Sequence, residues 1–181
     1  MALAKRIVLE EISPAHFSFT LKWLENESLR RELVIKNYPY SKKETAKWYK
    51  TYKEDESRLI YIARLISSSA PIGQIGFNRI DHANRNGEMH IFIGEQEYRG
   101  KGYGREMMEV FLDIAFNRFD LIKVWLQVND DNVSAIRFYK KMGFVREGLL
   151  KHHEIYNGCL INKYIYSRFN TLLIQNATNN T

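Results

Sequence analysis

The sequence lacks the features that would place the protein outside the cell or in a membrane. Its single cysteine, Cys159, excludes an internal disulfide, so a reducing cytoplasm is the expected compartment. No apolar run approaches the ~20 residues of a membrane span, and charged residues interrupt the N-terminal segment before it could act as a secretory signal. Proline is scarce, at three residues, and no linker or repeat divides the 181 residues. We therefore expect one domain, residues 1–169, followed by a flexible tail, residues 170–181.

Positive charge is in excess but is not concentrated. The chain has 27 Lys and Arg against 21 Asp and Glu, a net charge of +6 at pH 7. Residues 1–95 hold 15 basic and 12 acidic residues, and residues 96–181 hold 12 and 9. A nucleic-acid-binding domain usually carries a clustered basic stripe, so the even spread argues against such a partner. A small polyanion would also suit this balance.

The hydrophobic pattern predicts an α/β (α+β) fold. Residues 41–44 (SKKE) form a capping box that starts a helix. Strands are expected at 6–12, 59–66, 72–80, 88–93, 123–128, 144–148, 151–155 and 160–166, and helices at 14–28, from 41, from 102 to about 119, and at 134–142. The order of these elements, with hairpins in the first half of the chain and a β-α-β-α-β pattern in the second, indicates a mixed, mostly antiparallel sheet of about six to seven strands flanked by about four helices.

A glycine-rich turn, Arg99-Gly100-Lys101-Gly102-Tyr103-Gly104-Arg105, lies between a predicted strand and a predicted helix. Glycine permits close approach of backbone N–H groups to an anion, and the helix N-terminus adds partial positive charge. The turn is not a P-loop, because no GK[ST] follows. It is not the dinucleotide fingerprint either, because Arg105 stands where that motif needs glycine.

Two motifs resemble the GNAT N-acetyltransferase superfamily. The residues Arg99, Gly102 and Gly104 match the R/Q-x-x-G-x-G/A form of its acetyl-CoA site, and the segment 132–144 resembles its N-x-x-A-x-x-x-Y-x-K-x-G-F signature. The resemblance covers residues 5–168. The stretch EGLLKHHEIYNG that follows the second motif is similar to the RimJ/RimL-type and polyamine-acetylating branch.

The resemblance implies acetyl-CoA as cosubstrate, no metal, and a sheet whose fourth and fifth strands splay apart. The backbone of Phe92, Ile93 and Gly94 would pair with the pantetheine arm, as an added strand pairs with a sheet edge. The turn from Arg99 to Arg105 would hold the pyrophosphate, and Asn132 would bond the pantetheine from the other side. Lys140 or Lys141 is a candidate for the 3′-phosphate, although solvated charges on a helix are the favoured interpretation of both.

Acetyl transfer needs an unprotonated amine and a proton for the leaving thiolate. The resemblance makes Tyr139 the candidate general acid, since a phenol has a pKa near 10. Glu88 is the candidate base, directly or through water, with a pKa that burial could raise toward neutrality. His90, two residues on and on the same strand face, is a weaker alternative.

The acceptor stays open between a protein N-terminal amine, a polyamine and an amino sugar. Its groove is expected between residues 14–53 and the hairpin 151–163. Four carboxylates could attract a cationic amine, namely Glu25, Glu27, Glu32 and Glu154, while six lysines from Lys36 to Lys53 oppose it. A non-catalytic CoA-binding module of the same fold is the alternative function, and a homodimer is possible.

Overall fold

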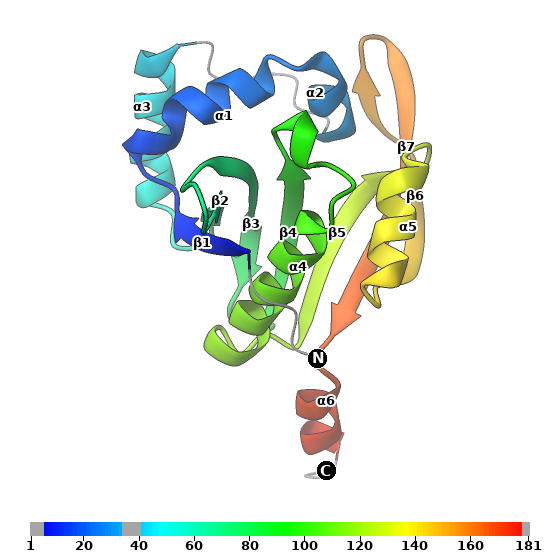
Figure 1. The fold of residues 1–181 in the computed structure, drawn as a ribbon. Helices are drawn as coiled ribbons and strands as arrows, with labels where there is room; N and C mark the ends of the chain where they lie inside the picture. The colour runs from blue at the N-terminus through cyan, green and yellow to red at the C-terminus, as the bar shows by residue number, and fades with distance from the viewer. Residues whose placement is uncertain (1–5, 34–40, 179–181) are drawn as a thin grey trace.

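The structure, a computed structural model, describes residues 6–33 and 41–178. Within these ranges seven strands form one sheet, and six α-helices accompany it (Figure 1). The strands are β1 (Ile7–Glu11), β2 (Leu59–Leu65), β3 (Pro71–Asp81), β4 (Asn86–Ile93), β5 (Lys123–Asn129), β6 (Val145–Tyr156) and β7 (Cys159–Phe169). The helices are α1 (Phe17–Leu24), α2 (Glu27–Leu33), α3 (Lys42–Lys53), α4 (Tyr103–Asp113), α5 (Val133–Lys141) and α6 (Thr171–Thr178).

The sheet is mixed and mostly antiparallel, as the sequence predicts. Its strand order is β1-β2-β3-β4-β5-β7-β6, and β4 and β5 form its parallel pair. This pair spans three positions, Asn86 to Glu88 opposite Lys123 to Trp125. Beyond Glu88 the two strands separate, so the expected splay between the fourth and fifth strands is confirmed.

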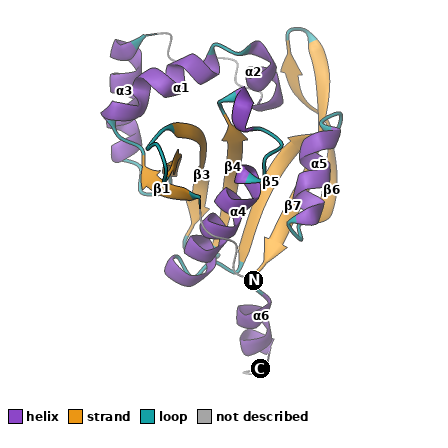
Figure 2. Ribbon diagram, in the orientation of Figure 1, coloured by secondary structure: helices purple, strands orange, loops and turns teal. Residues whose placement is uncertain are grey.

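Helices cover both faces of the sheet and create two cores (Figure 2). Buried Met107, Met108 and Phe111 of α4 pack on one face. On the other face Trp23 and Leu29 come from the α1–α3 side and pack near Phe92. Because strand side chains alternate, Met89 faces α4 whereas Glu88, His90 and Phe92 face the α1–α3 side.

The predicted helix over 14–28 is divided in the structure. A 3₁₀ turn at Pro14–His16 leads into α1, and a separate helix, α2, starts after Asn26. The side chain of Asn26 explains the break, because its Oδ1 accepts the Leu29 N–H at 3.2 Å and so caps α2. Ser41 is confirmed as the N-cap of α3, because the Glu44 N–H donates to Ser41 Oγ at 3.2 Å and that hydroxyl donates to Glu44 Oε2 at 2.9 Å.

The C-terminal third differs from expectation in two places. The two strands predicted at 144–148 and 151–155 are one strand, β6, whose pairing with β7 shifts at two irregular points. Such bulges keep a strand paired while bending it. Residues 171–178, predicted to be a flexible tail, form helix α6, which points away from the sheet (Figure 1). In the described part of the chain, no helix is long and apolar enough to span a membrane.

Candidate active site

A cleft of about 990 Å³ opens where β4 and β5 separate. Its lining comes from both splayed strands, the turn before α4, the length of α5, and α2, with Asn78 from β3 and Lys163 from β7. The divergence of the strands leaves backbone N–H and C=O groups along their facing edges, which a ligand can pair with. The tertiary fold therefore produces one channel that reaches both the α4–α5 side and the α1–α3 side of the sheet.

Most of the predicted site residues meet in this cleft. Its lining includes Glu88, Phe92, Ile93, Arg99, Gly100, Gly102, Gly104, Arg105, Asn132 and Tyr139. Gly94, Lys101 and Tyr103 are not part of the lining. Gly94 packs against α1, because a Cβ there would lie 2.3 Å from the Trp23 ring. Lys141 lines the cleft, whereas Lys140 does not.

The turn before α4 has the backbone geometry of an anion cradle. Gly100 and Gly102 have φ of 72° and 87°, in the left-handed region that glycine adopts without penalty. Gly102 is the N-cap of α4, so the first N–H groups of the helix have no carbonyl one turn earlier to bind. The Arg99 Nε donates to the Ile93 carbonyl at 3.0 Å, which holds its guanidinium beside the end of β4.

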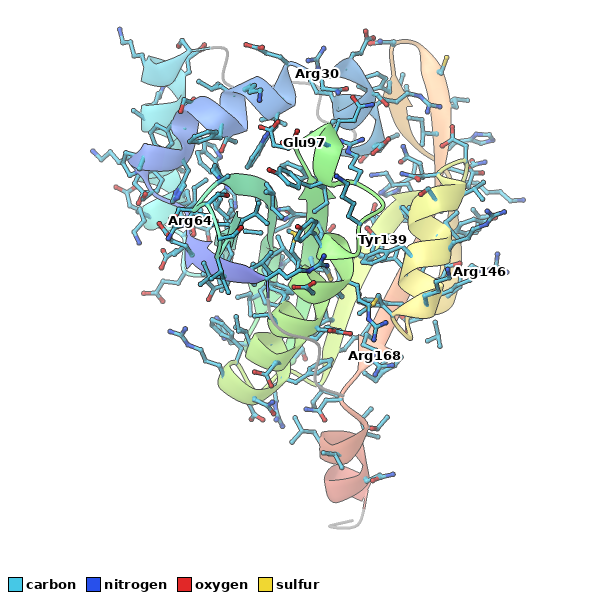
Figure 3. All side chains as sticks on the ribbon, in the orientation of Figure 1. Arg30, Arg64, Glu97, Tyr139, Arg146 and Arg168 are labelled. Carbon is cyan, nitrogen blue, oxygen red and sulfur yellow. The ribbon has the colours of Figure 1, made fainter. Side chains whose placement is uncertain are left out.

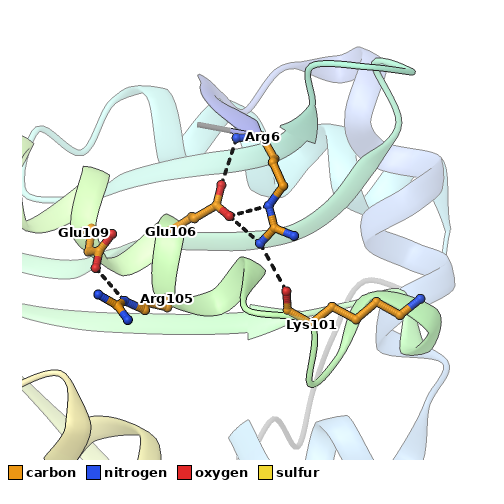
Figure 4. A network of polar contacts seen from close by, with 5 residues as sticks. All are labelled: Arg6, Lys101, Arg105, Glu106 and Glu109. Atoms are coloured by element: carbon orange, nitrogen blue, oxygen red, sulfur yellow. Dashed lines mark hydrogen bonds and ion pairs between the residues drawn. The ribbon is translucent and has the colours of Figure 1, made fainter. Parts of the chain in front are cut away.

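An ion pair that sequence analysis missed supports this turn from behind (Figure 4). The buried carboxylate of Glu106 binds the Arg6 guanidinium, with Nε 2.5 Å from Oε1, and accepts the Arg6 backbone N–H at 2.9 Å. The same guanidinium donates to the Lys101 carbonyl at 3.1 Å and lies over the Tyr103 ring at 4.2 Å. Arg6 thus ties the first strand to the glycine turn. In contrast, Arg105 pairs with Glu109 on the exposed surface of α4.

Asn132 serves as the N-cap of α5 in this structure. Its side-chain Oδ1 accepts the Ala135 N–H at 3.1 Å, which satisfies one of the unpaired amides of the helix start. Because Asn132 also lines the cleft, the cap fixes where its amide group stands relative to the splayed strands.

Tyr139 lies on the side of α5 that faces α4 and the cleft (Figure 3). Its side chain is 8% exposed and packs near Phe138, Phe144 and Tyr166. Burial raises the pKa of the phenol well above its ordinary value, and the negative charge of Glu32 adds to the shift. Tyr139 therefore keeps its proton at any neutral pH and can donate it.

Glu88 and His90 face the α1–α3 end of the same cleft. Burial raises the pKa of Glu88, partly offset by Lys163, Asn78 and Arg79. Burial lowers the pKa of His90 to about 4, so its imidazole is neutral at pH 7 and binds a proton weakly. The His90 Nε2 lies 2.8 Å from the Gln74 amide nitrogen. Of the two, Glu88 is the better proton acceptor.

Two carboxylates predicted to attract a cationic acceptor, Glu32 and Glu154, lie at this end with Lys163, a residue that sequence analysis did not single out. Glu32 of α2 and Lys163 of β7 line the cleft, and Lys163 Nζ lies 3.0 Å from Glu154 Oε1. The sequence signal that could have indicated this end of the cleft is the presence of polar residues inside otherwise apolar strands, such as Gln74, Asn78 and Gln127. Among the lysines expected to oppose a cation, the described side chains of Lys43, Lys47, Lys50 and Lys53 lie outside the cleft lining. Lys36 and the side chain of Lys42 lie outside the described residues.

Comparison with known proteins agrees with this geometry. A family model described as acetyltransferase (GNAT) domain matches residues 6–145. The spermidine N(1)-acetyltransferase of Escherichia coli K12 is 30% identical over 156 residues, covering 80% of this chain and 82% of the relative. An N-acetyltransferase 9-like protein of Caenorhabditis elegans is 27% identical, covering 97% and 93%.

The fold is shared with a solved spermidine N-acetyltransferase. The crystal structure of the Vibrio cholerae enzyme in complex with CoA and spermine superimposes with a TM-score of 0.86 at 23% identity, covering 93% of this chain and 98% of that one. At this identity the likeness establishes the fold. The family match, the glycine turn and the splayed strands together show that the chain belongs to the GNAT acetyltransferases and is an acetyl-CoA-dependent N-acetyltransferase.

Proposed function

We propose that this protein acetylates a primary amine of a polyamine. The observation that carries the proposal is the division of charge along one cleft. Arg99, Arg105 and Arg137 line it on the α4–α5 side, and Glu32 and Glu88 line it toward α1–α3. A basic end suits the phosphates of acetyl-CoA, and an acidic end suits an ammonium group. The E. coli relative named for spermidine acetylation supports the same acceptor class.

In this proposal, acetyl-CoA binds along the α4–α5 side. The backbone of Phe92 and Ile93 pairs with the pantetheine arm, and the turn from Arg99 to Arg105 holds the pyrophosphate. Neither Gly102 nor Gly104 has a Cβ, and no neighbouring atom lies within 3 Å of the place where one would stand. The space beside these two residues is therefore open to the pyrophosphate. The Arg6–Glu106 pair keeps the turn in place.

Transfer then takes place between the two ends of the cleft. Glu88 takes a proton from the acceptor ammonium, and the free amine attacks the thioester carbonyl. The C–S bond breaks, and Tyr139 donates its proton to the departing thiolate of CoA. The second proton that the amine nitrogen loses as the amide forms restores the Tyr139 phenol. Buried surroundings hold Tyr139 protonated, so it begins the reaction with the proton that it donates, and they raise the pKa of Glu88, which makes its ionised carboxylate a stronger base. No metal enters these steps.

The test is a screen for CoA release with purified protein and acetyl-CoA. Polyamines, amino sugars and peptides with free N-termini serve as acceptors at equal concentration. We expect turnover with polyamines and little with the other two classes. Turnover restricted to peptides or sugars would overturn the acceptor class, and absence of turnover with any amine would favour a non-catalytic CoA-binding module.

We also propose a cytoplasmic protein in which residues 1–169 act as one catalytic domain. A homodimer is supported by β6, an edge strand whose hairpin with β7 exposes Leu149, Ile155 and Leu160. Exposed apolar side chains on an unpaired strand are typical of a protein interface. Light scattering on the eluted peak of a sizing column measures the mass, and a value of one chain would exclude the dimer.

A further inference from the structure

Lys163 is a buried cation inside the acceptor end of the cleft. Its side chain is 9% exposed, and its Nζ lies 3.0 Å from Glu154 Oε1. It stands on β7 opposite Asn129 of β5, on the sheet face that carries Glu88, since Asn129 and Trp125 share a face and Trp125 pairs with Glu88. Lysine is rarely buried unless a partner compensates its charge.

The surroundings of Lys163 are rich in acceptors for a cation. The second carboxylate oxygen of Glu154 is buried and has no hydrogen-bond partner among the described residues, and the same holds for Asn129 Oδ1. Lys163 is also close enough to Glu88 to act on its carboxylate. The protein therefore supplies an ammonium of its own to a group of carboxylates that would otherwise attract ammonium groups of the acceptor.

We infer that Lys163 is a specificity-determining residue that limits how many positive charges an acceptor can bring into the cleft. By neutralising Glu154, it leaves Glu88 and Glu32 for the acceptor, which suits an amine with one or two charges. A tetraamine would have to place further ammonium groups near Lys163, and like charges repel strongly in a partly buried site. This inference rests on the proposed amine acceptor and refines it.

The experiment compares acceptors that all carry a primary amine but differ in their number of positive charges. Values of kcat/KM are measured for butylamine, 1,4-diaminobutane and spermine with the wild type and with Lys163→Met and Lys163→Arg. Lys123→Met is the matched control, because Lys123 also forms a pair with a glutamate, Nζ to Glu147 Oε2 at 2.6 Å, on the same sheet face but outside the cleft lining.

The decisive quantity is the ratio of kcat/KM for spermine to that for butylamine. We expect Lys163→Met to raise it by about tenfold, which corresponds to about 1.4 kcal/mol, the interaction of two like charges roughly 12 Å apart at an effective dielectric constant near 20. Lys163→Arg keeps the cation and should restore the wild-type ratio, and Lys123→Met should leave it unchanged. A general loss of structure would lower both values together and not move the ratio.

An unchanged ratio in an active Lys163→Met enzyme overturns the inference. If that variant does not fold, Glu154→Gln decides instead, because it leaves Lys163 unneutralised and should lower the ratio. A wild-type enzyme that acetylates other amines but no polyamine contradicts only the proposed acceptor class. In that case the role of Lys163 is decided by the ratio of kcat/KM for a multiply charged member of the accepted amines to that for a singly charged member.

Discussion

Two glycines of the turn, only two positions apart, should respond to alanine in opposite directions. Gly104 lies in the first turn of α4 with no positive φ, and an added Cβ would be 3.8 Å from the Phe138 ring, an ordinary contact. Gly102 has a φ of 87°, and a Cβ there would lie 3.3 Å from a terminal nitrogen of Arg6. The same substitution therefore meets a helical backbone at one site and a left-handed backbone at the other.

The backbone conformations set the expected magnitudes. Glycine within a helix costs roughly 0.5–1 kcal/mol relative to alanine, so Gly104→Ala should add about 0.5 kcal/mol to the free energy of unfolding. An L-residue in the left-handed region costs roughly 1–2 kcal/mol, so Gly102→Ala should lose about that amount. For a protein of this size 1 kcal/mol corresponds to roughly 2–4 °C in Tm, which gives a rise of about 1–2 °C and a fall of about 2–8 °C.

Circular dichroism melts and calorimetric titration with acetyl-CoA test both effects on the same samples. Gly104→Ala should keep its acetyl-CoA affinity, because the motif that this turn resembles takes glycine or alanine there. Gly102→Ala should bind more weakly, and Gly102→Val should not bind. Equal stability changes for the two alanine variants would refute the backbone reasoning, and normal binding by folded Gly102→Val would refute the cradle.

Three further outcomes are expected. Tyr139→Phe should lower kcat by roughly 10²–10⁴-fold, the usual contribution of a general acid, with acetyl-CoA affinity unchanged in titration; unchanged turnover would remove it from this role. Because burial raises the pKa of Glu88, the base form is lost as pH falls toward that pKa, so kcat/KM should fall on the acid side. Glu88→Gln should remove this limb from the pH profile, and a profile that keeps it identifies another base. Arg6→Met should raise the KM for acetyl-CoA with little change in kcat. Glu109→Gln, which breaks the exposed pair on the same helix, should change neither, and equal effects of the two substitutions would refute the supporting role of the Arg6–Glu106 pair.

Features that depend on neighbours in the sequence were predictable. Three such features are the Gly102–Gly104 turn, the helix after it and the Ser41 N-cap, which arise from backbone conformation and hydrogen bonds within a few residues. The residue types at these positions therefore predict them. The division of the first helix at Asn26 was equally local, but an asparagine cap inside a continuous apolar pattern was not recognised.

Residues that act together across the chain were not predictable from spacing. Arg6 and Glu106 are 100 positions apart, and each alone resembles an ordinary charged residue of a strand or helix. Their pairing exists because α4 packs beside β1. The lysine cluster on α3 gave the opposite error, since its charge count suggested a role near the acceptor that the described side chains do not have.

By itself the sequence determined the cosubstrate and the class of reaction, because the glycine turn from Arg99 to Arg105 and the motif around Tyr139 are contiguous segments. The tertiary structure decided which residues surround the proposed acceptor end of the cleft. Lys163, Glu154, Glu88 and Glu32 come from four separate elements, and only the splay of β4 from β5 and the packing of α2 bring them to one end of the cleft. Their charges act through space over a few ångströms, a separation that no sequence spacing records.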